Sequence, residues 1–327
     1  MIQLQTDLTR KRGDTIVFPT VRNLVGAGVT GNVVLEGNEE ILNARSLNLV
    51  VSAFRHAVAV SDWDEQKSVI DLREAAREAL MVWELEKMRN DIITSLEAIT
   101  ADNNVQVSYA AATAGQRNTW MVNNADRVLF GASKSNAVSG VMATALLTID
   151  NTADKMTAAT VTLAKRIART ASPRIRPISV NDDEEWFVMF VPSLPFRDLM
   201  QDPVIINALQ YAWERGRDNP LFTAGDILYN GVIIREVPEM PVIAGAGAGG
   251  IDVAMSALCG AQALGVAWAQ RMKSTTNVRD YGFFHGVGIQ EMRGIGKLRW
   301  GVDPTVDTTK PVDAGIVSVF TAAVADA

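Results

Sequence analysis

Cysteine and histidine are almost absent from this sequence. Its 327 residues include one cysteine, Cys259, and two histidines, His56 and His285. A single cysteine excludes an internal disulfide and a cysteine-rich zinc or iron–sulfur site, because each of these needs several thiols. Two histidines exclude a multi-histidine metal centre and leave only two candidates for histidine acid–base catalysis. The cysteine content fits a reducing compartment.

An excess of basic residues is also missing. The chain carries 31 Lys and Arg against 37 Asp and Glu, a formal net charge of −6. A chain built mainly to bind nucleic acid carries a basic excess, so that function class is disfavoured. Residues 1–12 lack the apolar core of a signal peptide. The longest low-charge stretch, 241–270, is too rich in glycine and alanine for a good lipid-facing helix, so we expect no membrane span.

A two-armed β excursion is predicted within the first 60 residues. Residues 14–24 are rich in strand formers, and apolar and polar residues alternate over 46–52. The segment between these arms is punctuated by glycines from Gly26 to Gly37, which permit turns that other residues resist. It has few large side chains, so we expect it to lean on another surface rather than form a core.

A long amphipathic helix is predicted over 64–99. This stretch has no proline or glycine, and its apolar residues fall mostly three or four apart. Ser61 or Asp62 would cap its start. At 1.5 Å per residue it would span about 50 Å, which is typical of the backbone of an elongated domain. The apolar positions do not hold a strict heptad, which disfavours a coiled coil.

The rest of the chain mixes helices and strands. Residues 103–140 are polar and loop-like, and 176–191 and the Asn230-Gly231 turn indicate two hairpins. Helices are predicted over 153–171, 194–215 and 251–271, and strands over 280–300 and 315–320. No βαβ rhythm is present, so the expected fold class is α+β.

No motif in the sequence indicates catalysis. Residues 245–250 match the G-x-G-x-x-G pattern, but the acidic residue expected about twenty positions later is missing, which favours a flexible glycine loop over a dinucleotide site. The acidic run 181–185 is interpreted as a solvated turn rather than a cation site, and the basic residues over 165–176 as a charged helix face. No nucleophile-elbow or zinc-protease motif occurs. We expect no enzyme, cofactor or metal.

The opening segment, 2–19, resembles the entry of the major capsid proteins of tailed phages, the family typified by the N-four-like phages. The similarity continues over 26–31, 35–40, 54–57, 65–66, 71–75, 187–192, 198–199, 219–222 and 260–265. This resemblance implies the Hong Kong ninety-seven type capsid fold, an α+β fold with an extended β loop, a long spine helix in a peripheral domain, and an axial domain.

On that plan the chain divides into five segments. Residues 1–60 hold a short N-terminal segment and the extended loop, and 61–150 the peripheral domain with its spine helix at about 64–99. The axial domain covers 151–265, with the glycine loop toward the capsomer axis. Residues 266–305 return to the peripheral domain, and 306–327 form a C-terminal return strand.

The resemblance also implies a function. A chain of this family is a major capsid protein that assembles as hexamers and pentamers into the icosahedral shell of a tailed phage, in the host cytoplasm, around double-stranded DNA that it contacts weakly. The implied partners are other copies of the chain, a portal protein, and scaffolding and cement or decoration proteins, without a membrane. The candidate intersubunit contacts are Lys11, Arg12, Arg22, Glu36, Glu39 and Glu40. The alternatives are an encapsulin-like cellular compartment and a nucleotide-binding oligomeric enzyme that uses the 245–250 loop.

Overall fold

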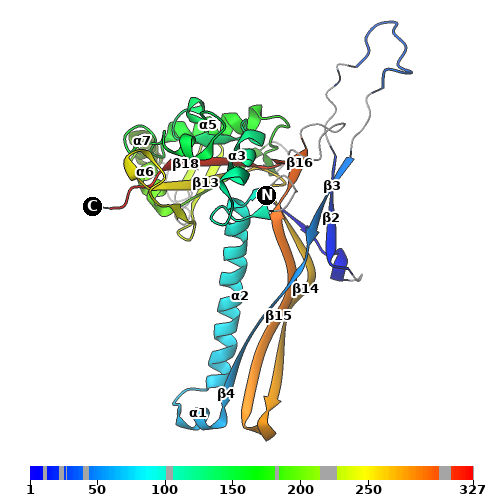
Figure 1. The fold of residues 1–327 in the computed structure, drawn as a ribbon, viewed down its shortest axis with the longest axis vertical. Helices are drawn as coiled ribbons and strands as arrows, with labels where there is room; N and C mark the ends of the chain where they lie inside the picture. Colours follow the sequence, from blue (N-terminus) through cyan, green and yellow to red (C-terminus); the bar gives the residue numbers. More distant parts are fainter. Residues whose placement is uncertain are drawn as a thin grey trace.

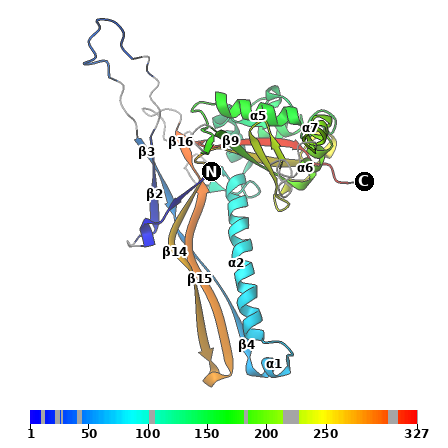
Figure 2. The ribbon, with the colours of Figure 1, turned by 180° about the vertical axis from the view of Figure 1, so that it is seen from behind.

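The computed structural model describes residues 1–9, 13–21, 26, 28–39, 44–100, 106–180, 184–213, 227–301 and 311–326. Three parts are distinct in Figure 1. A head at one end holds most of the helices, a long arm of one helix and several strands extends from it, and a β hairpin projects from their junction. The hairpin and the C-terminus lie on opposite sides of the head (Figure 2).

A four-stranded sheet forms the arm. Its order is β1-β14-β15-β4, and the strands are β1 (Ile2–Gln5), β14 (Leu264–Arg279), β15 (Phe284–Lys297) and β4 (Ser52–Ser61). β14 and β15 are antiparallel partners along a long hairpin, and β4 pairs with β15 from Ser52 opposite Arg293 to Ser61 opposite Phe284. β15 therefore has a partner strand on each side.

The predicted helix over 64–99 is two helices. α1 (Asp62–Lys67) is capped by Ser61, and α2 (Leu72–Glu97) runs the length of the arm. The break occurs because Asp71 caps α2, accepting hydrogen bonds from the backbone N–H groups of Arg73 (3.0 Å) and Glu74 (3.1 Å). The spine helix is thus confirmed, with 26 residues and a length of about 39 Å instead of about 50 Å.

One face of α2 packs on the arm sheet. Leu80 is buried with Val287 and Ile289 of β15, and Trp83 covers their edge. Nearer the head, Leu96 packs against Ala257 and Cys259 of the head sheet. The helix therefore links the arm to the head by apolar contacts at both of its ends.

An eight-stranded sheet is the centre of the head. Its order is β10-β11-β9-β13-β18-β7, and β12 pairs with β13 and β8 with β9. The strands are β7 (Val128–Phe130), β8 (Ile178–Val180), β9 (Glu184–Val191), β10 (Ile227–Tyr229), β11 (Val232–Glu236), β12 (Val242–Ile243), β13 (Val253–Cys259) and β18 (Ile316–Ala322). The head helices are α3 (Ala114–Asn123), α4 (Met142–Leu146), α5 (Ala158–Thr170), α6 (Ser193–Met200) and α7 (Pro203–Trp213).

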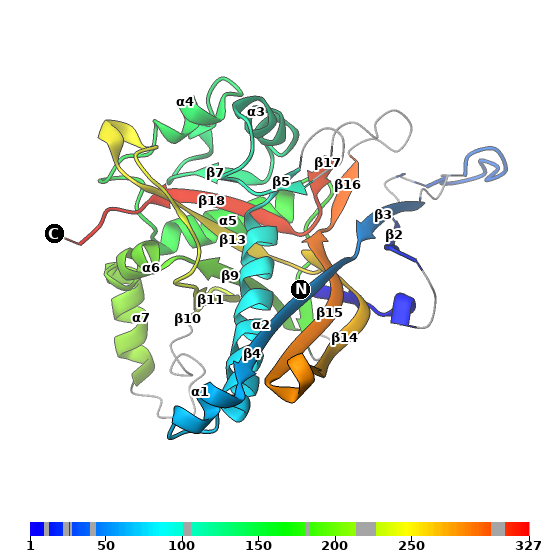
Figure 3. The same ribbon diagram turned by 60° about the horizontal axis from the view of Figure 1, so that its bottom comes forward.

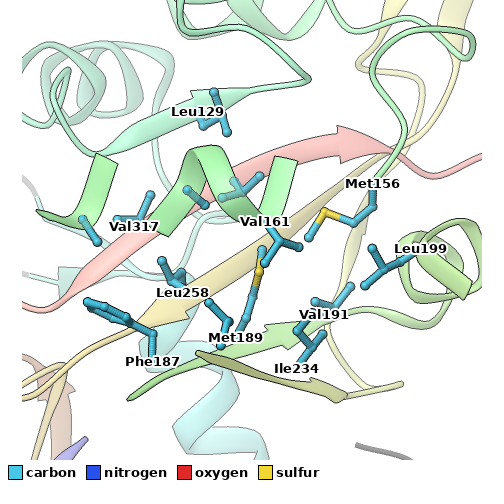
Figure 4. Packing of buried hydrophobic residues seen from close by; sticks show 14 of the residues in the cluster. Leu129, Met156, Val161, Phe187, Met189, Val191, Leu199, Ile234, Leu258 and Val317 are labelled. Atoms are coloured by element: carbon cyan, nitrogen blue, oxygen red, sulfur yellow. The ribbon is translucent and has the colours of Figure 1, made fainter. Parts of the chain in front are cut away.

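Both faces of the two central strands are buried. Leu258 and Val317 face a cluster that includes Val161 of α5 and Leu199 of α6 (Figure 4). On the other face, Met255 and Phe320 pack with residues of α3 and α4, and Figure 3 shows the helices on either side of the sheet. Every residue of β13 and β18 is buried.

Three short antiparallel pairs complete the structure. β2 (Thr15–Val21) pairs with β3 (Ala44–Val50), β5 (Ile99–Thr100) with β6 (Gln106–Val107), and β16 (Arg299–Gly301) with β17 (Pro311–Asp313). The β2–β3 pair is the base of the projecting hairpin, and it confirms the predicted two-armed excursion.

Most of the predicted elements are confirmed. The expected helix over 153–171 is α5, the first expected hairpin is β8–β9, and the last predicted strand is β18. The second hairpin is β10–β11, with Asn230 (φ 48°) and Gly231 (φ 69°) in its turn. The α+β class is confirmed.

The helix predicted over 251–271 is wrong, because that region forms β13 and the start of β14. A strand that is buried on both faces reads as a continuous apolar run, which periodicity cannot distinguish from a buried helix.

Two further expectations are corrected. Residues 103–140 are not simply a loop, since they contain α3, whose start is fixed by a capping box between Thr113 and Gln116, and β7. The helix predicted over 194–215 is divided into α6 and α7, and Gly216 lies outside the described residues.

Two neighbouring residues of α2 provide a test of the arm packing. The side chain of Leu80 is 1% exposed and that of Met81 is 54% exposed. Leu80→Ala should lower the free energy of unfolding by about 2–5 kcal/mol, since it leaves a cavity against β15. Met81→Ala should change it by less than about 0.5 kcal/mol. Urea unfolding of the soluble chain measures both, and equal effects would contradict the packing described above.

Candidate subunit interface surfaces

The projecting hairpin is anchored at its base and exposed at its tip. Ile16, Phe18 and Leu47 point from β2 and β3 into a cluster with Ala267, Leu298 and Ala314. At the tip, Val33, Val34 and Leu35 are between 61% and 67% exposed. Three adjacent aliphatic side chains in solvent are unfavourable unless another surface covers them.

Local hydrogen bonds give the tip a defined turn. The backbone N–H of Asn38 donates to the carbonyl oxygen of Leu35 (3.0 Å), and its side-chain amide donates to that of Val34 (2.9 Å). Gly37 has a φ of 87°, and its N–H donates to the carboxylate of Glu39 (2.7 Å). The aliphatic residues are therefore presented on a shaped turn.

The structure places two of the six predicted contact residues. Glu36 and Glu39 lie exposed at the tip, beside the aliphatic residues. The other four, Lys11, Arg12, Arg22 and Glu40, lie outside the described residues. Sequence reasoning found the two glutamates from their place in the glycine-rich segment, but it did not single out the aliphatic residues next to them.

A second exposed apolar surface lies at the far end of the arm. Trp63 of α1, Val69 and Ile70 between the helices, and Tyr281 and Phe283 at the β14–β15 turn are all exposed. The backbone N–H of Asp62 donates to the carbonyl oxygen of Phe283 (3.0 Å), so the two segments are bonded to each other. This arm-tip surface is a candidate for contact with a neighbouring molecule.

The outer face of α2 is a third such surface. Met81, Val82 and Leu85 are exposed on the helix, while Leu80 points into the arm. The spacing keeps Met81 and Leu85 on one side of the helix. The helix α2 therefore has one apolar face, with Leu80, that packs on its own sheet, and other apolar side chains, including Met81 and Leu85, that a partner could contact.

The two histidines have structural contacts. The ring of His56 on β4 packs on Trp83 of α2, with 4.6 Å between ring centroids. Nε2 of His285 lies 3.2 Å from Oδ1 of Asp62, near the arm tip. Both contacts lie between elements of the arm.

The glycine loop does not have the geometry of a nucleotide site. Its N–H groups donate internally, from Gly245 to Asp252 (2.8 Å), from Gly247 to Ile251 (2.8 Å) and from Ala248 to Ile149 (2.9 Å). The loop is followed by the strand β13. In a dinucleotide site the glycine loop leads into a helix, and the N–H groups at the start of that helix bind the phosphates. Within the described residues no group of His, Cys, Asp and Glu is placed to hold a metal ion.

The two charge runs in the sequence make surface contacts. The carboxylate of Glu185 pairs with Arg169 (2.9 Å), and Lys165 donates to the carbonyl oxygen of Asn230. Residues 181–183 lie outside the described residues. No described helix combines the length and apolar character that crossing a bilayer requires.

A buried ionic cluster fastens α2 to the arm sheet. Arg293 of β15 is fully buried, and its guanidinium lies 2.7 Å from Asp91, 2.9 Å from Glu291 and 3.8 Å from Glu84. Lys87 pairs with Asp91. Burial raises the pKa of the Glu291 carboxyl to about 7, against the opposing effect of Arg293.

A second buried ion pair joins the arm to the head. Nζ of Lys297, at the end of β15, lies 3.1 Å from the carboxylate of Asp313 on β17, and both side chains are buried. The indole N–H of Trp120 donates to the same carboxylate (3.2 Å), and the backbone N–H of Asp313 donates to Asn124 (2.9 Å). Arg127 donates to the carbonyl oxygen of Asp313. Three residues from α3 and the segment that follows it thus converge on Asp313.

The comparisons with known proteins agree with one another. A family model described as phage capsid protein matches residues 1–325. The chain is 26% identical to the major capsid protein of Pseudomonas phage KPP25, over 99% of this chain and 88% of that protein. The capsid of cyanophage Pam1 is similar with a TM-score of 0.87 and 35% identity, over 99% of this chain and 89% of the other. The capsid of Ralstonia phage GP4 has a TM-score of 0.77 at 22% identity, over 100% and 88%.

The Arg293 cluster predicts a pH dependence of stability. The pKa of Glu291 is higher in the folded chain, at about 7, than its ordinary value of 4.5, so the folded state binds this proton more tightly. The stability that the carboxyl contributes is therefore present below about pH 4.5 and is lost as the pH rises toward 7. In Glu291→Gln this loss should disappear.

Urea unfolding midpoints at pH 5 and pH 8 test this expectation. The wild-type midpoint should fall more between the two pH values than that of Glu291→Gln. Glu86→Gln, which changes an exposed carboxylate on α2, should behave as the wild type does. Parallel pH profiles for the wild type and Glu291→Gln would contradict the assignment.

Proposed function

This chain belongs to the phage capsid protein family and is a major capsid protein, a structural component of a tailed-phage shell, and from that membership we propose that its copies associate as hexamers and pentamers into an icosahedral shell around double-stranded DNA. Its relatives are structural capsid proteins, not enzymes. They give no support to the cellular-compartment or nucleotide-enzyme alternatives. The fold is the α+β capsid fold that the sequence predicts.

The observation that carries the proposal is the projecting hairpin. Its base is fixed in the molecule by Phe18 and Leu47, while its tip presents Val33, Val34 and Leu35 to solvent beyond the body of the chain. Exposure of these apolar side chains to water is unfavourable in free energy, and a neighbouring copy that covers them would remove the exposure. A shell repeats this contact at every subunit.

Charge would align the same contact. Glu36 and Glu39 flank the aliphatic residues, and we assign them to ion pairs with basic residues of the neighbouring copy. Lys11, Arg12, Arg22 and Glu40 remain candidates for the same interface. Ion pairs at the rim of an apolar contact fix its register more than they raise its affinity.

The other two apolar surfaces suit further subunit contacts. The arm-tip surface and the outer face of α2 lie away from the projecting hairpin, so one subunit can use all three surfaces at once. In a shell, symmetry would repeat such contacts at every subunit. We place the glycine loop, 245–250, toward the axis of the capsomer.

The remaining parts of the proposal rest on the family alone. The division expected from the sequence, 1–60, 61–150, 151–265, 266–305 and 306–327, is modified in one respect, because α3, β7 and α4 of the second segment and β18 of the last pack in the head with the third. Assembly takes place in the host cytoplasm, and the further partners are a portal protein and scaffolding and cement proteins. The net charge of −6 suits a container whose contact with packaged DNA is weak and non-specific.

Deletion of residues 26–37 tests the role of the hairpin tip. The deletion leaves the β2–β3 base and its buried cluster in place. We expect soluble subunits with wild-type circular dichroism but few closed particles by negative-stain electron microscopy and sedimentation. Normal shells from this variant would overturn the assignment.

A milder variant separates apolar contact from loop length. Replacing Val33, Val34 and Leu35 by serine keeps the chain length and the glycines, and it should also reduce shell formation. The matched control replaces the exposed head residues Val204 and Ile206 by serine, which lie far from the hairpin, and it should assemble normally.

A further inference from the structure

A groove of about 500 Å³ lies where α2 enters the head. It is lined by Ile93, Thr94 and Glu97 of α2 and by Tyr109, Val242 and Met255 from other segments. The volume lies within the range of small-molecule and side-chain binding sites, and none of the contacts described for the three apolar surfaces uses the groove.

Two polar atoms on the groove walls are buried without a partner. Glu97 is 5% exposed and Tyr109 is 8% exposed. Oε1 of Glu97 and the hydroxyl of Tyr109 have no hydrogen-bond partner within the described part of the chain. A buried polar group without a hydrogen-bond partner is unfavourable, more so when it is charged, so both atoms are able to bond to a ligand in the groove.

The cations near Glu97 are already engaged elsewhere. Arg117 donates to the carbonyl oxygens of Tyr109 (3.2 Å) and Ala110 (3.3 Å), and its guanidinium lies 4.6 Å from the centre of the Tyr109 ring. Lys297 is bonded to Asp313 (3.1 Å). At the groove margin Glu239 pairs with Arg89. Among the described residues, therefore, no cation is bonded to the buried carboxyl of Glu97 in this groove.

We propose that this groove binds a cationic group carried on an apolar stem, an ammonium or guanidinium that donates to Glu97 and Tyr109. The apolar residues Ile93, Val242 and Met255 would cover the stem. A charge-assisted hydrogen bond to a buried carboxylate is among the stronger polar contacts in proteins. A basic side chain of another protein segment and a free polyamine share this chemistry. The site goes beyond the assembly function and does not depend on it.

Protonation of Glu97 would control this site. Burial raises the pKa of the carboxyl to about 8, while Lys297 opposes the rise. The groups that face it are Lys297 from β15, Arg117 from α3, Tyr109 ahead of α3, and Glu239 ahead of β12. The carboxyl of Glu97 is thus mostly neutral at pH 7, and a bound cation would favour its ionised form. Cation affinity should rise with pH through this range.

Binding of butylguanidinium to the purified full chain tests the proposal. Butylurea, which has nearly the same shape without the charge, is the matched probe. Ligand-observed NMR titrations should show that at pH 8.5 butylguanidinium binds at least about tenfold more tightly than butylurea. At pH 7.0 butylguanidinium should bind less tightly than it does at pH 8.5. Equal affinity of the two probes, or an affinity of butylguanidinium that does not depend on pH, would overturn the proposal.

Two variants localise the effect. Glu97→Gln keeps the shape of the side chain and should reduce butylguanidinium affinity to that of butylurea, whereas Glu236→Gln, an exposed carboxylate outside the groove, should leave it unchanged. An unchanged affinity in Glu97→Gln, with folding verified by circular dichroism, would overturn the site. Because soluble chains suffice, a failure of shell assembly does not affect this result.

Two further probes distinguish the sources of the cation. A short extended peptide with a single arginine represents a protein segment, and spermidine represents a free polyamine. Tighter binding of the peptide would identify a partner protein, and tighter binding of spermidine a small-molecule ligand. If Glu97→Gln abolishes the binding of both the peptide and spermidine, the groove is supported as their common site. If the variant still binds both, the proposal is contradicted.

Discussion

The buried ion pair between Lys297 and Asp313 is the joint on which the rest of the molecule depends. It connects the last residue of β15, which has carried the arm along its whole length, to β17 and through it to the head. A buried pair is costly to desolvate and is maintained only with further hydrogen bonds. Trp120 donates one to the carboxylate of Asp313, and Asn124 accepts one from the backbone N–H of the same residue. Removing either charge would leave the other unpaired in the interior, so the arm and the head are fixed to each other by a set of mutually dependent contacts.

The same principle operates further along the arm. Arg293 binds three carboxylates from β15 and α2, and Leu80 fills the space beyond them. The polar cluster sets the register of the helix on the sheet and the apolar contacts supply most of its stability. The arm is stiffened because it is attached at several points, through the Arg293 cluster within the arm and the Lys297–Asp313 pair at its junction with the head. The exposed surfaces then lie on a rigid frame.

Sequence reasoning predicted the elements whose signal is local. The spine helix, the two-armed excursion, two hairpins and the last strand follow from periodicity and turn residues, and all of them are present. It failed where tertiary contacts decide the outcome. β13 was taken for a helix because both of its faces are buried. α3 was missed although its capping box is a local signal, because the polar composition of 103–140 indicated a loop and the burial of Trp120 is decided by tertiary packing. The resemblance to capsid proteins supplied the function, which no pattern of chemistry in the chain would have given.

The candidate sites divide in the same way. Glu36 and Glu39 could be found from the glycine-rich segment around them. Glu97 and Tyr109 could not, because a carboxyl in a helix and a tyrosine in a polar stretch are unremarkable until folding buries both beside one groove. Burial without a partner is a property of the packed structure and has no signature in the sequence.

The position of β18 has a consequence for how the protein is made. This strand lies in the interior of the head sheet, between β13 and β7, although it is formed by residues 316–322. β1 likewise pairs with residues 264–267 of β14. A ribosome therefore releases the arm strands and most of the head before the strand that closes the head sheet has emerged. Contacts between residues so far apart in sequence form slowly, so newly made chains spend time as incomplete heads. Until that strand is inserted, the subunit lacks its finished shape. A newly synthesised chain can therefore join a shell only after a delay.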